Sequence, residues 1–280
     1  MSKSPVLIDK DFVRVRVCRH GPLLYNPSDI YIGGALDRYG ESSEAEADIF
    51  RRVVAPGHWV VDIGANIGAH TTAFAQSAGP TGRVIAFEPQ RIVFQMLCAN
   101  VALNALDNVV AHWAAVGADP GVTVVPSIDY RSTQNFGSFF LGEHGKGDKV
   151  PVVTLDSFDL SACHFIKIDI EGMEQQALAG ARGTIMRHRP LLYVENDRAA
   201  NSAGLIRAIM NMDYRLYWHL PPLFNPGNFY GDTENIFPGI VSINMFCVPR
   251  EKTLSVAGAI EIASPEASWR DAVTPPPNRG

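Results

Sequence analysis

Apolar and polar residues alternate along this chain in two different periods, which predicts strands and helices in turn. The short apolar runs that predict strands lie at residues 58–63, 83–88, 109–116, 165–170 and 191–195. The segments with helical apolar spacing lie at residues 41–55, 67–78, 90–104, 173–187 and 202–212. Strands and helices that alternate in this way are typical of a doubly wound, mostly parallel sheet with helices on both faces. We therefore expect an α/β fold.

A chain of 280 residues is long enough for one large α/β domain. Weak alternation over residues 6–34 predicts a hairpin or edge strand, so residues 1–38 are interpreted as an N-terminal extension. The main domain is placed at residues 39–250, of which 214–250 are rich in aromatic residues and prolines. Residues 251–280 are interpreted as a C-terminal segment, whose last ten residues contain three consecutive prolines and are expected to be disordered.

Composition and charge indicate which kinds of binding partner and which cellular compartment to expect for this protein. The formal net charge of −5 argues against a surface that binds nucleic acid by neutralising phosphates. No apolar run approaches the ~18 residues of a transmembrane helix, and the N-terminus lacks the apolar segment of a secretory signal. The four cysteines are scattered without a Cys-x-x-Cys pair, as is typical of buried thiols in a reducing compartment. We therefore expect a cytoplasmic protein without a membrane span.

The most informative stretch is the turn that follows the first predicted strand of the sheet. Its pattern Asp62-x-Gly64-x-Asn66-x-Gly68 leads into a predicted helix, and the next predicted strand ends in Glu88. A strand, a glycine turn, a helix and a second strand form a βαβ unit that can hold a nucleoside-bearing cofactor. The glycines permit a tight turn and the close approach of a ligand to the backbone. Glu88 is placed to accept hydrogen bonds from two ribose hydroxyls.

The same turn favours S-adenosylmethionine over a dinucleotide. A dinucleotide site needs the pattern G-x-G-x-x-G with a helix N-terminus facing the pyrophosphate, and here the middle glycine is missing. Asp62 would repel a pyrophosphate but suits the ammonium of the methionine moiety, directly or through water. Asn66 and Thr71 are candidates for binding the methionine carboxylate, with ordinary turn and helix-start roles as the alternative. Ala65, in the same turn, completes the predicted cofactor-binding set.

Acidic residues end four of the predicted strands. They are Asp62, Glu88, Asp169 and Glu195, the last followed by Asn196. If the sheet is parallel, these side chains lie along one rim, where ligands of such sheets bind. Taken singly, each acid can instead have a structural role, because Asp169 can cap the following helix and Glu171 can lie in its first turn.

Asp169, Glu195 and Asn196 together predict a site for a divalent metal. They supply three hard oxygen ligands, and Mg²⁺ completes such a partial shell with water and substrate oxygens. The ion would bring a substrate hydroxyl to the methyl donor and lower its pKa. This arrangement resembles that of the catechol-type O-methyltransferases, with Glu195 in place of an aspartate.

Three side chains are candidates for the base that takes the hydroxyl proton. Asp169 and Glu171 lie two positions apart, so in extended backbone they point the same way. His219 is the candidate for a site without metal, because an imidazole near neutral pKa can take a hydroxyl proton. His219 belongs to the aromatic-rich segment 217–230, which suits a sugar ring or another amphipathic acceptor, or forms an ordinary core edge. His70 is interpreted as a partly buried helix residue.

Several blocks between residues 39 and 196 carry a family resemblance. They are Tyr39-Gly40-Glu41-x-Ser43-Glu44-x-Glu46, Asp62-Ile63-Gly64-Ala65-Asn66-Ile67-Gly68-Ala69-His70-Thr71, Ala86-Phe87-Glu88-Pro89, Thr154-Leu155-Asp156-Ser157, Ile166-Lys167-Ile168-Asp169-Ile170-Glu171-Gly172-x-Glu174, and Arg189-Pro190 leading to Glu195. On these residues the chain resembles the FkbM family of S-adenosylmethionine-dependent methyltransferases. The resemblance implies a class I, Rossmann-like methyltransferase fold and, usually, O-methylation of a hydroxyl on a sugar, a glycan or a natural product.

Three functions are compatible with these patterns. The leading hypothesis is an S-adenosylmethionine-dependent O-methyltransferase with a small-molecule or glycan acceptor. The second is an NAD-linked Rossmann oxidoreductase or epimerase, against which the missing middle glycine argues. The third is a binding module that keeps the cofactor site without catalysis. The acids at four strand ends argue against the third, because cofactor binding alone needs only two of them.

Overall fold

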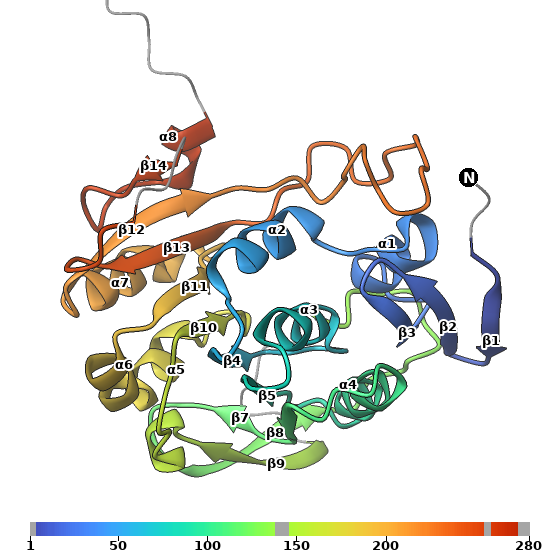
Figure 1. Cartoon of the computed structure of the whole chain (residues 1–280), viewed down its shortest axis with the longest axis horizontal. Coiled ribbons are helices and arrows are strands. Elements are labelled where there is room, and N and C mark those ends of the chain that lie inside the picture. The colour runs from blue at the N-terminus through green and yellow to red at the C-terminus, as the bar shows by residue number, and fades with distance from the viewer. Residues whose placement is uncertain (1–3, 138–145, 255–258, 274–280) are drawn as a thin grey trace, which may run out of the picture.

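The computed structural model describes residues 4–137, 146–254 and 259–273 of the chain. Within these residues the centre of the molecule is an eight-stranded sheet (Figure 1). In spatial order its strands are β14 (Ile260–Glu261), β12 (Tyr214–His219), β13 (Asn244–Pro249), β11 (Leu191–Glu195), β10 (Phe165–Ile168), β4 (Trp59–Ile63), β5 (Arg83–Phe87) and β6 (Val109–His112). The strands from β11 to β6 run parallel to one another. Strands β13, β12 and β14 extend the sheet in antiparallel pairs.

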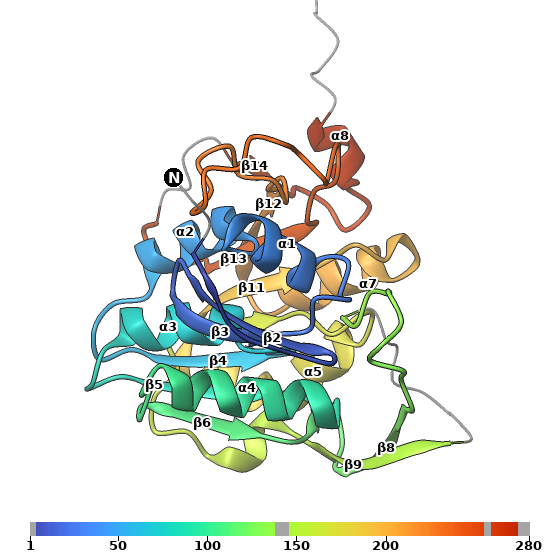
Figure 2. The same ribbon diagram turned by 90° about the vertical axis from the view of Figure 1, so that its right-hand side faces the viewer.

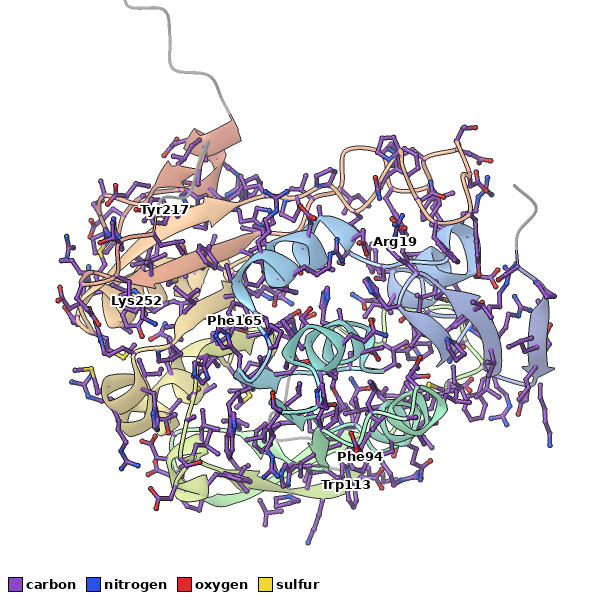
Figure 3. The ribbon with its side chains drawn as sticks, viewed as in Figure 1. Arg19, Phe94, Trp113, Phe165, Tyr217 and Lys252 are labelled. Atoms are coloured by element: carbon purple, nitrogen blue, oxygen red, sulfur yellow. The ribbon has the colours of Figure 1, made fainter. Side chains whose placement is uncertain are left out.

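Helices cover both faces of this sheet. On one face lie α2 (Glu44–Val53), α3 (Ala69–Ala78) and α4 (Arg91–Leu103), and on the other lie α5 (Glu174–Gly180), α6 (Arg182–His188) and α7 (Ala199–Met210). The alternation of side chains along each strand explains this, since Val60 faces the first group and Val61 the second. Phe165 lies on the first face, with its ring centroid 5.5 Å from those of Phe50 and Phe74 (Figure 3). The doubly wound, mostly parallel α/β fold predicted from the sequence is therefore confirmed.

Two smaller sheets flank the central one. The N-terminal sheet consists of β1 (Val6–Lys10), β2 (Val13–Cys18) and β3 (Gly21–Tyr25), and it leads into α1 (Ile32–Tyr39). The other consists of β7 (Ala115–Val116), β8 (Gly121–Pro126) and β9 (Gly147–Val153), with the 3₁₀ helix η1 (Leu155–Phe158) after it. Figure 2 shows the N-terminal sheet in front of the central sheet, with α8 (Trp269–Val273) at the top. Residues 24 and 100 join the N-terminal sheet to α4, since Asn100 Oδ1 accepts a hydrogen bond from Leu24 N at 2.6 Å.

Two predicted elements differ in the structure. The predicted strand at 109–116 is divided, because β6 ends at His112 and β7 pairs with β9 in a separate sheet. The predicted helix at 173–187 breaks at Ala181, next to Gly180, where a Cβ would lie only 1.9 Å from the carbonyl oxygen of Gly117. This close backbone contact fixes α5 against β7 and redirects the chain into α6.

Helix α1 lies where the sequence predicts only a hairpin or an edge strand. The three prolines of the expected disordered tail lie outside the described residues. Among the described helices, none has the length and apolar character needed to cross a membrane.

Candidate active site

A cavity of about 510 Å³ lies beyond the carboxyl ends of β4, β5, β10 and β11. Its volume falls in the range of ~300–1,000 Å³ that is usual for small-molecule sites. The strand ends contribute Gly64, Glu88, Asp169 and Glu195 to its wall. The lining also includes Tyr31, Ile32, Ser42 and Ser43 from around α1 and α2, residues 240–243 before β13, and Asn244 at the start of β13. Three of the four acids that the sequence places at strand ends, Glu88, Asp169 and Glu195, therefore share one rim, as expected for a parallel sheet, and Asp62 does not line the cavity.

Contacts within the protein fix the shape of the glycine turn. Gly64 has φ +79°, and a Cβ there would lie 1.9 Å from the carbonyl oxygen of Asp169. The glycine is therefore required by the close packing of this turn against the end of β10. At Gly68, with φ +85°, an added Cβ would meet the end of the Leu97 side chain at 2.6 Å. Gly64 lines the cavity and Gly68 does not.

Glu88 holds the turn and faces the cavity. Its Oε2 accepts a hydrogen bond from Asn66 N at 2.9 Å, and its Oε1 accepts one from Gln90 N at 2.8 Å. Burial raises the pKa of Glu88 to about 7, although both backbone hydrogen bonds act in the opposite direction. Asn66 and Ala65 also line the cavity. Asn66 Oδ1 accepts a hydrogen bond from Ile67 N, so this part of its side chain has the turn role given above as the alternative.

Asp62 and Thr71 lie behind the cavity wall. Asp62 has no exposed surface, and its Oδ2 accepts a hydrogen bond from Thr71 Oγ1 at 2.6 Å. Neither residue lines the cavity. Their contacts fix the end of β4 to the start of α3. This is the helix-start role given above as the alternative for Thr71, and a contact of Asp62 with the methionine ammonium through water stays a prediction.

Lys167 is a functional candidate that the sequence analysis missed. Lys167 is 2% exposed. Its Nζ lies 3.1 Å from Asp169 Oδ2 and 3.6 Å from Asp62 Oδ1. Burial lowers the pKa of the ammonium, but Asp169 and Asp62 outweigh burial and raise it above its usual range. The signal was present in the sequence, because a lysine inside a buried apolar strand needs carboxylate partners.

Asp169 follows β10, Glu195 ends the neighbouring parallel strand β11, and both line the same cavity. Burial acts to raise the pKa of Asp169, but Lys167 and a hydrogen bond from Glu195 hold it below its ordinary value. Burial and the charge of Asp169 raise the pKa of Glu195 well above its ordinary value. Glu195 Oε2 is buried and receives no hydrogen bond from the described residues. A protonated Glu195 can donate to Asp169, so the two carboxyl groups can share one proton.

The predicted metal ligands do not converge. The side chain of Asn196 is turned away from the cavity, and its Nδ2 contacts Met245 Sδ at 3.2 Å. The ammonium of Lys167 already supplies a positive charge beside Asp169. The described residues contain no group of three or more His, Cys, Asp and Glu side chains able to hold a metal ion. The donor set therefore does not fit Mg²⁺, and the predicted metal site is not supported.

The other two predicted bases lie in different surroundings. Glu171 lines the cavity with φ +57° and forms an ion pair with Arg198. Burial, followed by the charge of Asp169, raises the pKa of Glu171 to about 7. His219 does not line the cavity, and its Nδ1 is hydrogen-bonded to Tyr193 Oη at 2.7 Å. Its position therefore does not support a role as base, although burial does lower its pKa.

The aromatic segment 217–230 does not form a platform in the cavity, because Leu223 is its one residue on the wall among those described. Tyr217 and Trp218 are buried in the core, and Phe224 packs on Tyr39 with ring centroids 5.3 Å apart. The ordinary core-edge interpretation therefore describes most of this segment.

A second polar group in the wall connects α2, α3 and β13. His70 Nε2 lies 3.3 Å from Glu46 Oε2, and Asn244 Nδ2 donates a hydrogen bond to Glu46 Oε1 at 3.2 Å. All three residues line the cavity. Asn244 comes from a strand far along the chain, so no spacing in the sequence indicates this cluster.

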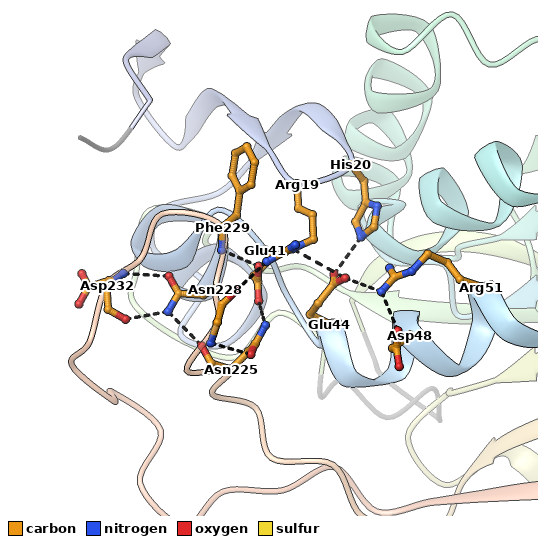
Figure 4. A network of polar contacts seen from close by, with 11 residues as sticks. Arg19, His20, Glu41, Glu44, Asp48, Arg51, Asn225, Asn228, Phe229 and Asp232 are labelled. Carbon is orange, nitrogen blue, oxygen red and sulfur yellow. Dashed lines mark hydrogen bonds and ion pairs between the residues drawn. The ribbon is translucent and has the colours of Figure 1, made fainter. Parts of the chain in front are cut away.

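The wall formed by the C-terminal part of the chain is fixed to the N-terminal part through Glu41 (Figure 4). Its Oε2 accepts hydrogen bonds from Arg19 Nε at 2.6 Å and from Phe229 N at 2.7 Å, and its Oε1 accepts one from Asn225 Nδ2 at 2.7 Å. Glu41 is 4% exposed. These contacts tie Asn225 and Phe229, in the segment before β13, to the N-terminal part of the chain.

Comparison with known proteins decides the family. The model of the methyltransferase FkbM domain matches residues 62–216, which is more than half of the chain. The chain belongs to the FkbM methyltransferase family. The match includes the glycine turn, Glu88, Lys167 and Asp169, so the cavity at the strand ends is that of an FkbM methyltransferase domain. No curated protein sequence matches the chain.

Three solved structures illustrate what this FkbM domain is similar to. The methyltransferase FkbM from Methylobacillus flagellatus KT has 21% identity and a TM-score of 0.46, over 72% of this chain and 50% of its own. The O-methyltransferase TomG from Streptomyces achromogenes, in complex with SAM, has 9% identity and a TM-score of 0.44, over 74% and 80%. Aeropyrum pernix fibrillarin with bound S-adenosyl-L-methionine has 12% identity and a TM-score of 0.45, over 89% and 100%. The chain spans about half the length of the Methylobacillus protein.

Proposed function

We propose that this FkbM-family protein transfers a methyl group from S-adenosylmethionine to a hydroxyl group of a sugar, a glycan or a natural product. The observation that carries the proposal is that the glycine turn, Glu88 and Asp169 converge on one cavity at the carboxyl ends of parallel strands. This cavity combines the expected cofactor contacts with carboxyl groups able to take a proton.

In this proposal Glu88 accepts hydrogen bonds from the ribose hydroxyls. The N-terminus of α3 reaches the cavity at Ala69, and a helix N-terminus suits the methionine carboxylate. The positive sulfonium suits the side of the cavity that carries Asp169 and Glu195. These assignments place the reacting methyl group near the carboxyl pair.

The acceptor oxygen then attacks the methyl carbon in line with the carbon–sulfur bond. A carbon–oxygen bond forms, the carbon–sulfur bond breaks, and its electron pair stays on sulfur to give neutral S-adenosylhomocysteine. The hydroxyl proton goes to Asp169 and the pair that Asp169 forms with Glu195. Lys167 holds Asp169 in its ionised, proton-accepting form until this happens. No step involves Mg²⁺.

The charge of the wall supports an acceptor without phosphate. The carboxyl groups that line the cavity beside the proposed methyl position are Glu46, Asp169, Glu171, Glu195 and Asp197. The cations Lys167 and Arg198 are both paired with carboxylates. Hydroxyl groups donate to carboxylates, whereas a phosphate meets repulsion, so we propose a small-molecule or glycan acceptor and no nucleic acid.

A ligand comparison followed by a transfer assay tests the function. S-adenosylhomocysteine is expected to raise the melting temperature, and NADH is expected to leave it unchanged. Transfer of labelled methyl groups from S-adenosylmethionine to a panel of glycans and polyketide alcohols should then identify the acceptor class. Stabilisation by NADH alone would favour the oxidoreductase. Methyl transfer confined to carbon or nitrogen acceptors would exclude O-methylation.

A further inference from the structure

The side-chain amide of Gln90 has one bonded end and one end without a partner. Gln90 lines the cavity and is 6% exposed. Its Nε2 donates a hydrogen bond to the carbonyl oxygen of Phe136 at 2.7 Å. Its Oε1 is buried and receives no hydrogen bond from the residues that the structure describes. Because the Phe136 carbonyl can only accept, the orientation of the amide is fixed with the oxygen as the unsatisfied atom.

An unsatisfied buried acceptor in a cavity wall calls for a ligand that donates. Buried polar groups are paired in most structures, and the exceptions mark positions where something else completes the pair. Other side-chain oxygens nearby already have donors, since Asn66 Oδ1 accepts from Ile67 N and Asn135 Oδ1 accepts from Gly137 N. Gln90 Oε1 therefore differs from these oxygens in having no donor among the described residues.

The position of Gln90 relative to Glu88 indicates which part of a ligand it meets. Gln90 N donates to Glu88 Oε1 at 2.8 Å, so the two residues are fixed to one another at the end of β5. Glu88 is the residue to which we assign the ribose hydroxyls. The nucleobase is joined directly to the ribose, so a side chain that adjoins Glu88 on the cavity wall is within reach of the base.

We propose that Gln90 Oε1 accepts a hydrogen bond from the exocyclic amine of adenine and selects adenine over 6-oxo purines. Adenine carries an amine donor at position 6, whereas hypoxanthine carries a carbonyl acceptor there, which would face Gln90 Oε1 as one acceptor against another. Sites built to pair with a donor reject analogues that lack it. This inference rests on the proposed function, because it assumes that the cavity binds S-adenosylmethionine.

Calorimetric titration of the whole protein with S-adenosylhomocysteine and with S-inosylhomocysteine tests the proposal without an acceptor. The inosine analogue is expected to bind about ten- to hundred-fold more weakly, the range that follows from an unpaired buried polar group. Gln90→Met has a side chain of similar length without the acceptor oxygen. It should bind S-adenosylhomocysteine more weakly and bring the ratio of the two dissociation constants close to one.

Glu88→Gln is the matched control. It should weaken both ligands and leave their ratio as in the wild type, because both carry the same ribose. Equal binding of the two ligands by the wild type overturns the proposal, as does an unchanged ratio in Gln90→Met. If that variant does not fold, the wild-type ratio still decides. Failure of both ligands to bind the wild type contradicts the proposed function itself, which separates the two results.

Discussion

The Lys167 ammonium lies 3.1 Å from Asp169 Oδ2, at the position where the sequence predicts a metal ligand. The two residues come from the same stretch of chain, with Lys167 inside β10 and Asp169 directly after this strand. Because a fixed cation already neutralises Asp169, the site has the electrostatic partner that a divalent ion would otherwise supply. The four predictions below follow from this relationship and from the turn that packs against it.

Methyl transfer is expected to continue undiminished in EDTA. The ammonium of Lys167 and the outward-turned side chain of Asn196 leave no suitable donor set for an ion at Asp169 among the described residues. The measurement is the rate of methyl transfer in chelator, with and without added Mg²⁺ in excess. A rate that falls in chelator and returns with Mg²⁺ would restore the metal hypothesis.

Binding of S-adenosylmethionine at pH 7 should release more protons than binding of S-adenosylhomocysteine, by up to about one proton. The sulfonium adds a positive charge beside Asp169 and Glu195 and favours loss of their shared proton, whereas the thioether is neutral. Besides these two residues, the titratable groups that act on the pair are Lys167, His70, Glu171, Glu174 and Asp197. Titration calorimetry in buffers of different ionisation enthalpy counts the protons.

Glu195→Gln should remove most of this difference in proton release, because a glutamine cannot give up a proton to the solvent. Glu266→Gln, which changes an acid in a surface pair with Arg207, should keep it. Equal proton release by the two wild-type complexes would show that the pair does not respond to the sulfonium.

The affinity for S-adenosylhomocysteine should increase as the pH rises from 6 to 8, because Glu88 has a pKa of about 7 and its ionised form is the stronger acceptor. Burial raises this pKa above its unfolded value. The contribution of the protonated group to stability is therefore present at low pH and is lost as the pH rises through about 7. Glu88→Gln should bind the ligand more weakly with a flatter pH profile. A wild-type affinity that is constant across this range would exclude the titration of Glu88.

Gly64→Ala is expected to destabilise the fold itself. The new Cβ would lie 1.9 Å from the carbonyl oxygen of Asp169, and the residue would keep a φ of +79°. Gly231→Ala is the matched control, because Gly231 also has a positive φ, +69°, but an added Cβ meets nothing within 4 Å. The control should lose about 1 kcal/mol from backbone strain alone, and Gly64→Ala clearly more. Chemical denaturation measures both. Equal losses would mean that the turn can move away from β10.

The alternation of strands and helices, the glycine turn and the acids at strand ends could all be predicted from the amino-acid sequence. These features are local, since each depends on the period of apolar residues or on backbone freedom within a few positions. Parallel topology then brings Glu88, Asp169 and Glu195 to one rim without further information. For this reason the fold class and the place of the cavity could be predicted.

Which of these side chains face the cavity, and which residues contact them there, depends on the packing of distant elements. Asp62 Oδ2 accepts a hydrogen bond from Thr71 behind the wall, Asn196 turns toward Met245, and His219 pairs with Tyr193. Glu46, His70 and Asn244 meet from three distant segments. The sequence could not show this, because the direction of a side chain at a strand end depends on burial and on partners from other elements. Gln90 Oε1, which is buried and has no hydrogen-bond partner among the described residues, could likewise be found only from the packing.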